Sequence, residues 1–183
     1  MTLITGFGPF LSVTDNPSGR LAAESGLPHR VLEVSFDAVD EFVEGLDPAD
    51  FETLLMLGVA GRASTMRVEL VAHNVIGSTP DVRGHVQGPS AISPMHPAQL
   101  AGTLWTGPEL LNEGDGWVPS VDAGDYLCNY IYFRAAQRFP DKPVGFLHVP
   151  PYEAMPFEEQ RELLDRILGQ LVSQAPRVLG GPR

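Results

Sequence analysis

The sequence predicts an α/β fold, a sandwich built on a central, mostly parallel sheet. Apolar, β-branched runs alternate with amphipathic segments along the chain, as strands alternate with helices in such folds. One run, residues 52–59, is apolar throughout, as in a strand covered on both faces. No repeat or linker divides the 183 residues, so we expect a single domain over residues 1–183.

The first element is a strand over residues 2–7, a short β-branched run. A loop follows, and then Asn16 and Pro17 have the pattern of a helix N-cap with proline at the first helical position. They predict a helix over residues 17–25, which Gly26 would end.

The middle of the chain continues the alternation. A second strand is predicted over residues 30–36, an acidic helix over 37–46 and the buried strand over 52–59. Residues 67–75 mix β-branched and polar side chains, as a strand does. Residues 76–99 are rich in Gly, Pro, Ser and His, and a loop of this length is usually functional or mobile.

The last third carries weak and strong signals. Residues 108–114 are a weak helix and 117–121 a weak strand, whereas 123–139 predict a clear helix and 143–149 the last clear strand. The strongest helix covers residues 156–174. The apolar stripe of the helix over 123–139 consists of Leu127, Ile131 and Ala135. That of the helix over 156–174 consists of Leu163, Leu164, Ile167, Leu168, Leu171 and Val172.

Composition excludes several classes of function. The formal net charge of −11 argues against nucleic acid and against docking on anionic lipid, since both need a basic face. No signal peptide and no membrane span are predicted. The single cysteine rules out an intrachain disulfide, so a soluble cytoplasmic protein is expected.

Two common ligand sites are poorly supported. The loop GFGPF lacks the third glycine of the dinucleotide fingerprint and the lysine of a P-loop, so it is either a tight turn or an aromatic wall in which Phe7 and Phe10 line a small apolar pocket. The five histidines make neither the HExxH spacing nor another compact ligand set. We therefore predict no metal and no cofactor.

Cys128 has two interpretations. A lone cysteine is commonly a small apolar residue in a core. Cys128, however, falls in the first turns of a predicted helix, where the positive end of the helix dipole favours a thiolate. The preceding residues, VDAG, could start that helix and offer free backbone N–H groups to an oxyanion.

A thiolate nucleophile needs a base, and the base needs an orienting group. His148 stands near the end of a predicted strand and suits the first role, although it could equally be satisfied within the strand. Glu69 stands inside an apolar strand, where a carboxylate is costly unless it is paired. Its alternatives are a solvent-facing position or a structural pair with Arg67.

Four segments, taken in order, resemble pyroglutamyl peptidase I, the pyrrolidone carboxyl peptidase family of cysteine peptidases. These segments span most of the chain and are TGFGPF followed by NPS, GVAGRASTMRVELVAHN, DAGDYLCN and GFLHVPP. The resemblance implies an α/β/α fold with a twisted central sheet. It also implies the removal of N-terminal pyroglutamyl residues from peptides, with Glu69, Cys128 and His148 as the catalytic residues.

The resemblance also implies a substrate pocket. Phe7 and Phe10 match the aromatic residues against which the lactam ring lies, Asn16 matches an asparagine near them, and Tyr126 and Leu127 match positions that help to form the pocket. Asn16 has a purely structural interpretation as well, as the helix cap.

The sequence departs from the family at several places. The chain is short, Val59 replaces a common glutamine, and residues 76–92 match poorly. The difference over residues 76–92 leaves both the preference for the leaving group and the oligomeric state open. Many bacterial members are tetramers, so the resemblance allows a homo-oligomer. Two alternatives remain: a catalytically silent homologue that binds small lactam or peptide ligands, and a nucleotide-binding α/β domain that uses GFGPF and GVAGR.

Overall fold

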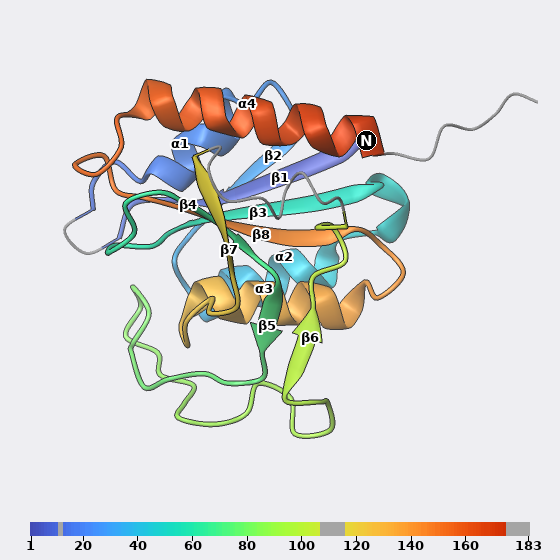
Figure 1. Ribbon diagram of the computed structural model, residues 1–183. Helices are drawn as coiled ribbons and strands as arrows, with labels where there is room; N and C mark the ends of the chain where they lie inside the picture. The colour runs from blue at the N-terminus through green and yellow to red at the C-terminus, as the bar shows by residue number, and fades with distance from the viewer. Residues whose placement is uncertain (11–12, 107–115, 175–183) are drawn as a thin grey trace, which may run out of the picture.

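A computed structural model describes residues 1–10, 13–106 and 116–174. Its centre is a six-stranded sheet in the order β2-β1-β3-β8-β4-β7 (Figure 1). The strands are β1 (Thr2–Phe7), β2 (His29–Leu32), β3 (Thr53–Val59), β4 (Met66–Glu69), β7 (Trp117–Ser120) and β8 (Val144–Val149). In this order, β2, β1, β3 and β8 each run parallel to the next strand. Strand β4 runs antiparallel to β8 and parallel to β7, so the direction reverses once within the sheet.

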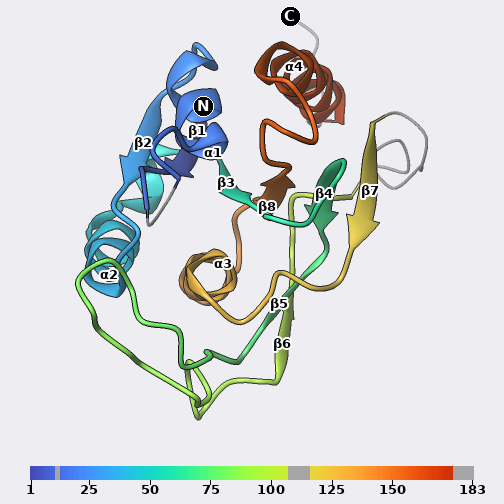
Figure 2. The same cartoon turned by 90° about the vertical axis from the view of Figure 1, so that its left-hand side faces the viewer.

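Helices cover both faces of this sheet, which confirms the predicted fold class. They are α1 (Pro17–Glu24), α2 (Phe36–Gly45), α3 (Leu127–Arg138) and α4 (Phe157–Gln174). Helices α1 and α4 lie on one face, and α2 and α3 lie on the other (Figures 1 and 2). Among the described residues, no helix combines the length and the apolar character that a bilayer crossing needs.

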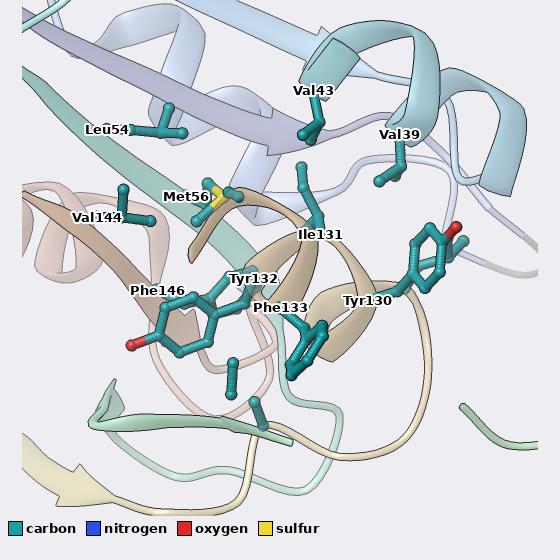
Figure 3. Close-up of a cluster of buried hydrophobic side chains, with 14 of the residues drawn as sticks. Val39, Val43, Leu54, Met56, Tyr130, Ile131, Tyr132, Phe133, Val144 and Phe146 are labelled. Atoms are coloured by element: carbon teal, nitrogen blue, oxygen red, sulfur yellow. The ribbon is translucent and has the colours of Figure 1, made fainter. Parts of the chain in front are cut away.

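Each face of the sheet has its own apolar core. Figure 3 shows the core under α2 and α3, where Ile131 and Val43 meet side chains of the sheet such as Met56. The opposite core joins Leu21 of α1 and Leu164 of α4 to the other face. The predicted stripes account for these contacts, since their members on α3 and the first three on α4 are buried. Leu168 and Leu171 pack at the margin, and the side chain of Val172 lies outside the described part of the chain.

The prediction of one strand over residues 67–75 was wrong. The chain leaves the main sheet after β4, and Val71–His73 forms β5, which pairs antiparallel with β6 (Gln99–Ala101) in a separate small sheet. The switch falls at Leu70. Its N–H donates to the carbonyl of Ser120, the last residue of β7 in the main sheet, and its carbonyl accepts from the N–H of Gly102, which directly follows β6 of the small sheet. The small sheet packs on α3, which therefore lies between two sheets (Figure 2).

Two further boundaries differ from the prediction. The second strand stops at Leu32 rather than at residue 36, because Ser35 has become the N-cap of α2. Helix α3 begins at Leu127 rather than at residue 123. Gly124 has a φ of 79°, which is incompatible with a helix, and its N–H donates to the Asp122 carboxylate. The weak helix predicted over 108–114 lies outside the described residues.

The predicted N-cap at Asn16 is confirmed, and it also holds the first loop. Its side-chain oxygen accepts from the N–H of Ser18 at 3.1 Å and from the Ser18 hydroxyl at 2.8 Å. Its amide nitrogen donates to the carbonyl of Gly8 at 2.9 Å. One buried side chain thus fixes the start of α1 and the course of the loop that follows β1.

We therefore predict that Asn16→Ala lowers the free energy of unfolding by about 1–2 kcal/mol, because it removes a helix cap and a buried loop contact together. Urea denaturation measures the change. The matched control is Asp47→Ala, which removes the exposed cap of the short 3₁₀ helix η1 (Pro48–Asp50) and should cost less than about 0.5 kcal/mol. Equal costs for the two variants would contradict the role given to Asn16.

Candidate active site

Three elements meet at the carboxyl ends of the parallel strands, where ligand sites of α/β folds lie. His148 is the penultimate residue of β8, and Gly58, its register partner, is the penultimate residue of β3. Cys128 is the second residue of α3, which packs on this face of the sheet. The structure therefore brings the predicted nucleophile and the predicted base to one place.

The sulfur of Cys128 lies directly over Gly58. A Cβ atom at Gly58 would stand 2.6 Å from this sulfur and 2.7 Å from Cζ of Phe146. Real Cβ atoms do not approach so closely, so the thiol occupies space that only glycine leaves open. Cys128 itself is partly exposed and reduced.

His148 is held from behind by Glu69. The Nδ1 atom of His148 and Oε1 of Glu69 are 2.7 Å apart. The two residues are diagonal neighbours in the antiparallel pair of β4 and β8, since Glu69 stands opposite Phe146, two positions before His148. Alternation along each strand places both side chains on the face that α3 covers. With Nδ1 engaged, Nε2 is the ring nitrogen that remains for the thiol.

Glu69 is a buried carboxylate. It is 0% exposed, and His148 is 5% exposed, so the solvent-facing alternative for Glu69 is excluded. Its ion-pair partner is His148, not Arg67. The second carboxylate oxygen, Oε2, has no hydrogen-bond partner among the described residues. Among the residues that the structure describes, His148 is thus the partner that compensates the buried carboxylate.

The surroundings favour a protonated His148. Burial disfavours the charged ring, but the hydrogen bonds with Cys128 and Glu69 and their negative charge outweigh it and raise the pKa of His148 to about 9. The imidazole can therefore carry a proton at neutral pH next to the thiol.

The first turn of α3 offers backbone donors beside the thiol. Its N-cap, Tyr126, makes no side-chain cap hydrogen bond, so within the described part of the chain the N–H groups of this turn stay available to an anion. The sequence predicted such donors in the preceding residues VDAG instead. The late start of α3 moves them to the turn that contains Cys128.

The predicted pocket residues surround this edge of the sheet to differing degrees. Phe7 ends β1 and is 5% exposed, whereas Phe10 is half-buried on the margin of the same core. Tyr126 is half-buried, and its hydroxyl donates to Pro80 of the long loop at 3.0 Å. The side chain of Leu127 is 1% exposed in the core, so it could serve a pocket only through its backbone. Asn16 is engaged in the contacts given above. The role of all five toward substrate stays a prediction.

The loop GFGPF is a packed turn. A Cβ atom at Gly6 would collide with the backbone of Ser18, so this glycine allows α1 to lie against β1. The next N–H groups are occupied: Phe7 donates to the Ser18 hydroxyl, Gly8 to the carbonyl of Leu32 and Phe10 to that of Val13. No donor of these three is left for a phosphate. In the described part of the chain, no cluster of three metal-ligating side chains occurs either.

Sequence reasoning missed two residues that shape the site and its surroundings, Gly58 and Asp81. Gly58 could have been found, because a glycine inside a buried strand indicates close approach of another group. Asp81 is buried and accepts from the N–H groups of Phe36, Arg83 and His85, which anchors the long loop near Tyr126. Nothing in the sequence distinguished this aspartate from a solvated loop residue.

A thiol on a helix N-terminus, set over a buried imidazole–carboxylate pair at the edge of an α/β sheet, defines a cysteine hydrolase. A family model described as pyroglutamyl peptidase matches residues 1–160. The chain belongs to the pyroglutamyl peptidase family.

Individual relatives agree with this assignment. The pyrrolidone-carboxylate peptidase of Clavibacter michiganensis is 30% identical over 164 residues, which cover 81% of this chain and 77% of the relative. That of Thermococcus litoralis is 32% identical over 166 residues, covering 81% and 75%. The crystal structure of pyrrolidone carboxyl peptidase from Thermus thermophilus superposes with a TM-score of 0.79 at 33% identity, covering 92% of this chain and 98% of that one. A mutant of the Pyrococcus furiosus peptidase gives 0.85 at 25% identity, covering 95% and 99%.

The His148–Glu69 contact predicts an unusual titration. In the wild type, the NMR signal of the His148 ring should titrate with a midpoint of about 9, above the ordinary value of about 6.5. Glu69→Gln removes a negative charge and so should lower the midpoint. A midpoint that does not change in Glu69→Gln would exclude Glu69 as a cause of the raised pKa.

The space over Gly58 predicts that Gly58→Ala displaces the thiol from His148. We expect alkylation of Cys128 by iodoacetamide at pH 7 to slow by about tenfold, because the sulfur loses its imidazole partner. Gly145→Ala is the matched control, since its Cβ would meet Leu104 and Trp105 on the opposite face of the sheet. If both variants react at the same rate, the glycine does not position the sulfur.

Proposed function

We propose that this chain hydrolyses the peptide bond that follows an N-terminal pyroglutamyl residue, with Cys128 as nucleophile, His148 as general acid and base, and Glu69 as the group that orients His148. The observation that carries the proposal is the 2.7 Å contact between Glu69 and His148 beneath the Cys128 thiol. Membership of the pyroglutamyl peptidase family supplies the reaction class.

In the first half-reaction, Cys128 acts as a thiolate beside the imidazolium of His148, and its sulfur attacks the carbonyl carbon of the pyroglutamyl residue. The carbonyl oxygen becomes an oxyanion, which the N–H groups in the first turn of α3 stabilise. His148, protonated at neutral pH because its pKa is raised to about 9, gives its proton to the leaving nitrogen. The carbon–nitrogen bond breaks, the shortened peptide departs as an amine, and a thioester to Cys128 remains.

In the second half-reaction, water attacks the thioester. Neutral His148 takes a proton from this water, and the sulfur leaves as a thiolate when the tetrahedral intermediate collapses. Free pyroglutamate is released, and the imidazolium stands again beside the thiolate. Glu69 keeps Nδ1 engaged through both halves, so Nε2 performs each proton transfer. The chemistry requires no metal or cofactor.

We place the lactam ring against Phe7 and Phe10, with Tyr126 as a further wall. An apolar site of this kind suits a flat, uncharged ring. An ordinary N-terminus carries an ammonium group that would be desolvated without a partner, so such peptides are rejected. The substrates are therefore peptides with N-terminal pyroglutamate. The reducing cytosol, which keeps a lone functional thiol reduced, is the compartment we assign.

The two alternatives from the sequence are less well supported. A nucleotide-binding domain would need free donors in the loop after β1, and the N–H groups of Phe7, Gly8 and Phe10 are already engaged. A catalytically silent homologue would have no use for a buried carboxylate whose described hydrogen-bond partner is His148. Turnover of a fluorogenic pyroglutamyl amide under reducing conditions decides between the silent homologue and the enzyme.

We predict that Cys128→Ala and Cys128→Ser lower turnover of this amide on the order of 10³-fold or more, because the reaction loses its nucleophile. Both side chains are similar in size to cysteine, so the free energy of unfolding should change by less than about 1 kcal/mol. One equivalent of iodoacetamide should abolish the activity of the wild type. Full activity in Cys128→Ala would refute the proposed mechanism.

A further inference from the structure

A buried tyrosine connects the helix of the nucleophile to the strand of Glu69. Tyr132 follows Cys128 by four positions on α3, so the two side chains lie on the same face of the helix. The hydroxyl of Tyr132 donates to the main-chain carbonyl of Glu69 at 2.8 Å, and the side chain is 0% exposed. This bond fixes α3 against the end of β4.

The ring of Tyr132 makes a second connection to the site. Its centroid is 5.8 Å from that of Phe146, beside which it lies in Figure 3. The Phe146 ring is in turn 4.9 Å from the ring of His148, and its Cζ atom shares the space over Gly58 with the Cys128 sulfur. Tyr132 therefore contacts the main chain of Glu69 and the ring of Phe146, which packs against His148, and it shares helix α3 with Cys128.

The position of the hydroxyl is itself built into the fold. A Cβ atom at Gly102 would overlap the hydroxyl oxygen of Tyr132, so Gly102 provides the space in which this oxygen lies. Gly102 is also fixed, because its N–H donates to the carbonyl of Leu70, the residue after Glu69. Burial and the charge of Glu69 raise the pKa of Tyr132, which keeps the phenol protonated as a donor.

We propose that Tyr132 is a positioning residue, whose hydroxyl sets the separation between Cys128 and the His148–Glu69 pair. This inference rests on the proposed function and deepens it. A tyrosine kept only for packing would be replaced by phenylalanine without effect on the reaction. A positioning residue would not, because small displacements of a nucleophile from its base lower the rate strongly.

The test compares Tyr132→Phe with Tyr130→Phe. Tyr130 is on the same helix, and its hydroxyl donates to Asp40 at 3.0 Å on the side of α2. Each variant thus loses one hydrogen-bonded hydroxyl, but only Tyr132→Phe loses the link to Glu69. For both variants, kcat and KM are measured with a fluorogenic pyroglutamyl amide. The rate of Cys128 alkylation is measured with iodoacetamide at pH 7, and Tm is measured by circular dichroism.

We expect Tyr132→Phe to lower kcat by about tenfold with KM within about twofold, and to slow alkylation at least threefold. Tyr130→Phe should keep both rates within about twofold of the wild type, even where the two Tm values fall equally. The proposal is overturned if Tyr132→Phe keeps the kcat and the alkylation rate of the wild type, or if Tyr130→Phe loses as much.

A second variant covers a failure of Tyr132→Phe to fold. Gly102→Ala keeps the hydroxyl of Tyr132 but displaces it. It should lower kcat and the alkylation rate by the same factors as Tyr132→Phe. Wild-type values of both in a folded Gly102→Ala would equally overturn the proposal. Absence of turnover in the wild type would refute the proposed function alone, because the alkylation rates of Tyr132→Phe and Tyr130→Phe still decide whether Tyr132 positions the thiol.

Discussion

The buried contact between Glu69 and His148 is the constraint on which the site depends. A fully buried carboxylate is costly unless a partner compensates for lost hydration. Oε1 of Glu69 contacts His148, and Oε2 has no hydrogen-bond partner among the described residues. The fold must therefore deliver the imidazole to a fixed place. With Nδ1 of His148 engaged by Glu69, Nε2 is the ring nitrogen that remains for the thiol of Cys128. The hydrogen bond between Glu69 and His148 therefore serves two purposes: it compensates for the buried carboxylate, and it orients the imidazole.

The reversal of strand direction makes this contact available. If β4 ran parallel to β8, its carboxyl end would lie level with that of β8 at the edge of the sheet. Because β4 is antiparallel, its last residue, Glu69, pairs with Phe146, which lies deeper in the sheet than His148. Glu69 therefore contacts His148 from the interior of the sheet. The chain then leaves at Leu70 for the small sheet, which covers α3 from outside. Helix α3, which carries the candidate nucleophile Cys128, is therefore held on both sides.

Much of this arrangement could be predicted from the sequence. Apolar periodicity located α4, and continuous apolar runs located the buried strand β3 and the strand that carries His148. The pair Asn16–Pro17 fixed the start of α1. Local signals suffice there because each element is defined by its own residues. The family resemblance then joined Glu69, Cys128 and His148, although 79 positions separate Glu69 from His148.

The remaining features depend on tertiary contacts that no local pattern contains. Residues 67–75 have the composition of one strand, and only the competing partners Ser120 and Gly102 divide it at Leu70. The start of α3 was placed too early because the positive φ of Gly124 cannot be distinguished from a helical glycine by spacing. The long loop also has an unexpected anchor, since Asp81 accepts three backbone N–H groups.

Cys128 illustrates why a lone cysteine carries so little information by itself. Its helix position suits both a packed thiol and a reactive one. What distinguishes the two is the absence of a side chain at Gly58, which brings the sulfur onto the strand next to His148. The same device recurs at Gly102, which admits the hydroxyl of Tyr132. One of these glycines lies within β3 of the main sheet, and the other directly follows β6 of the small sheet. Because neither carries a Cβ atom, α3 can place both the thiol of Cys128 and the hydroxyl of Tyr132 against the elements that hold His148 and Glu69. The geometry of the site therefore depends on these two glycines as well as on the reactive side chains.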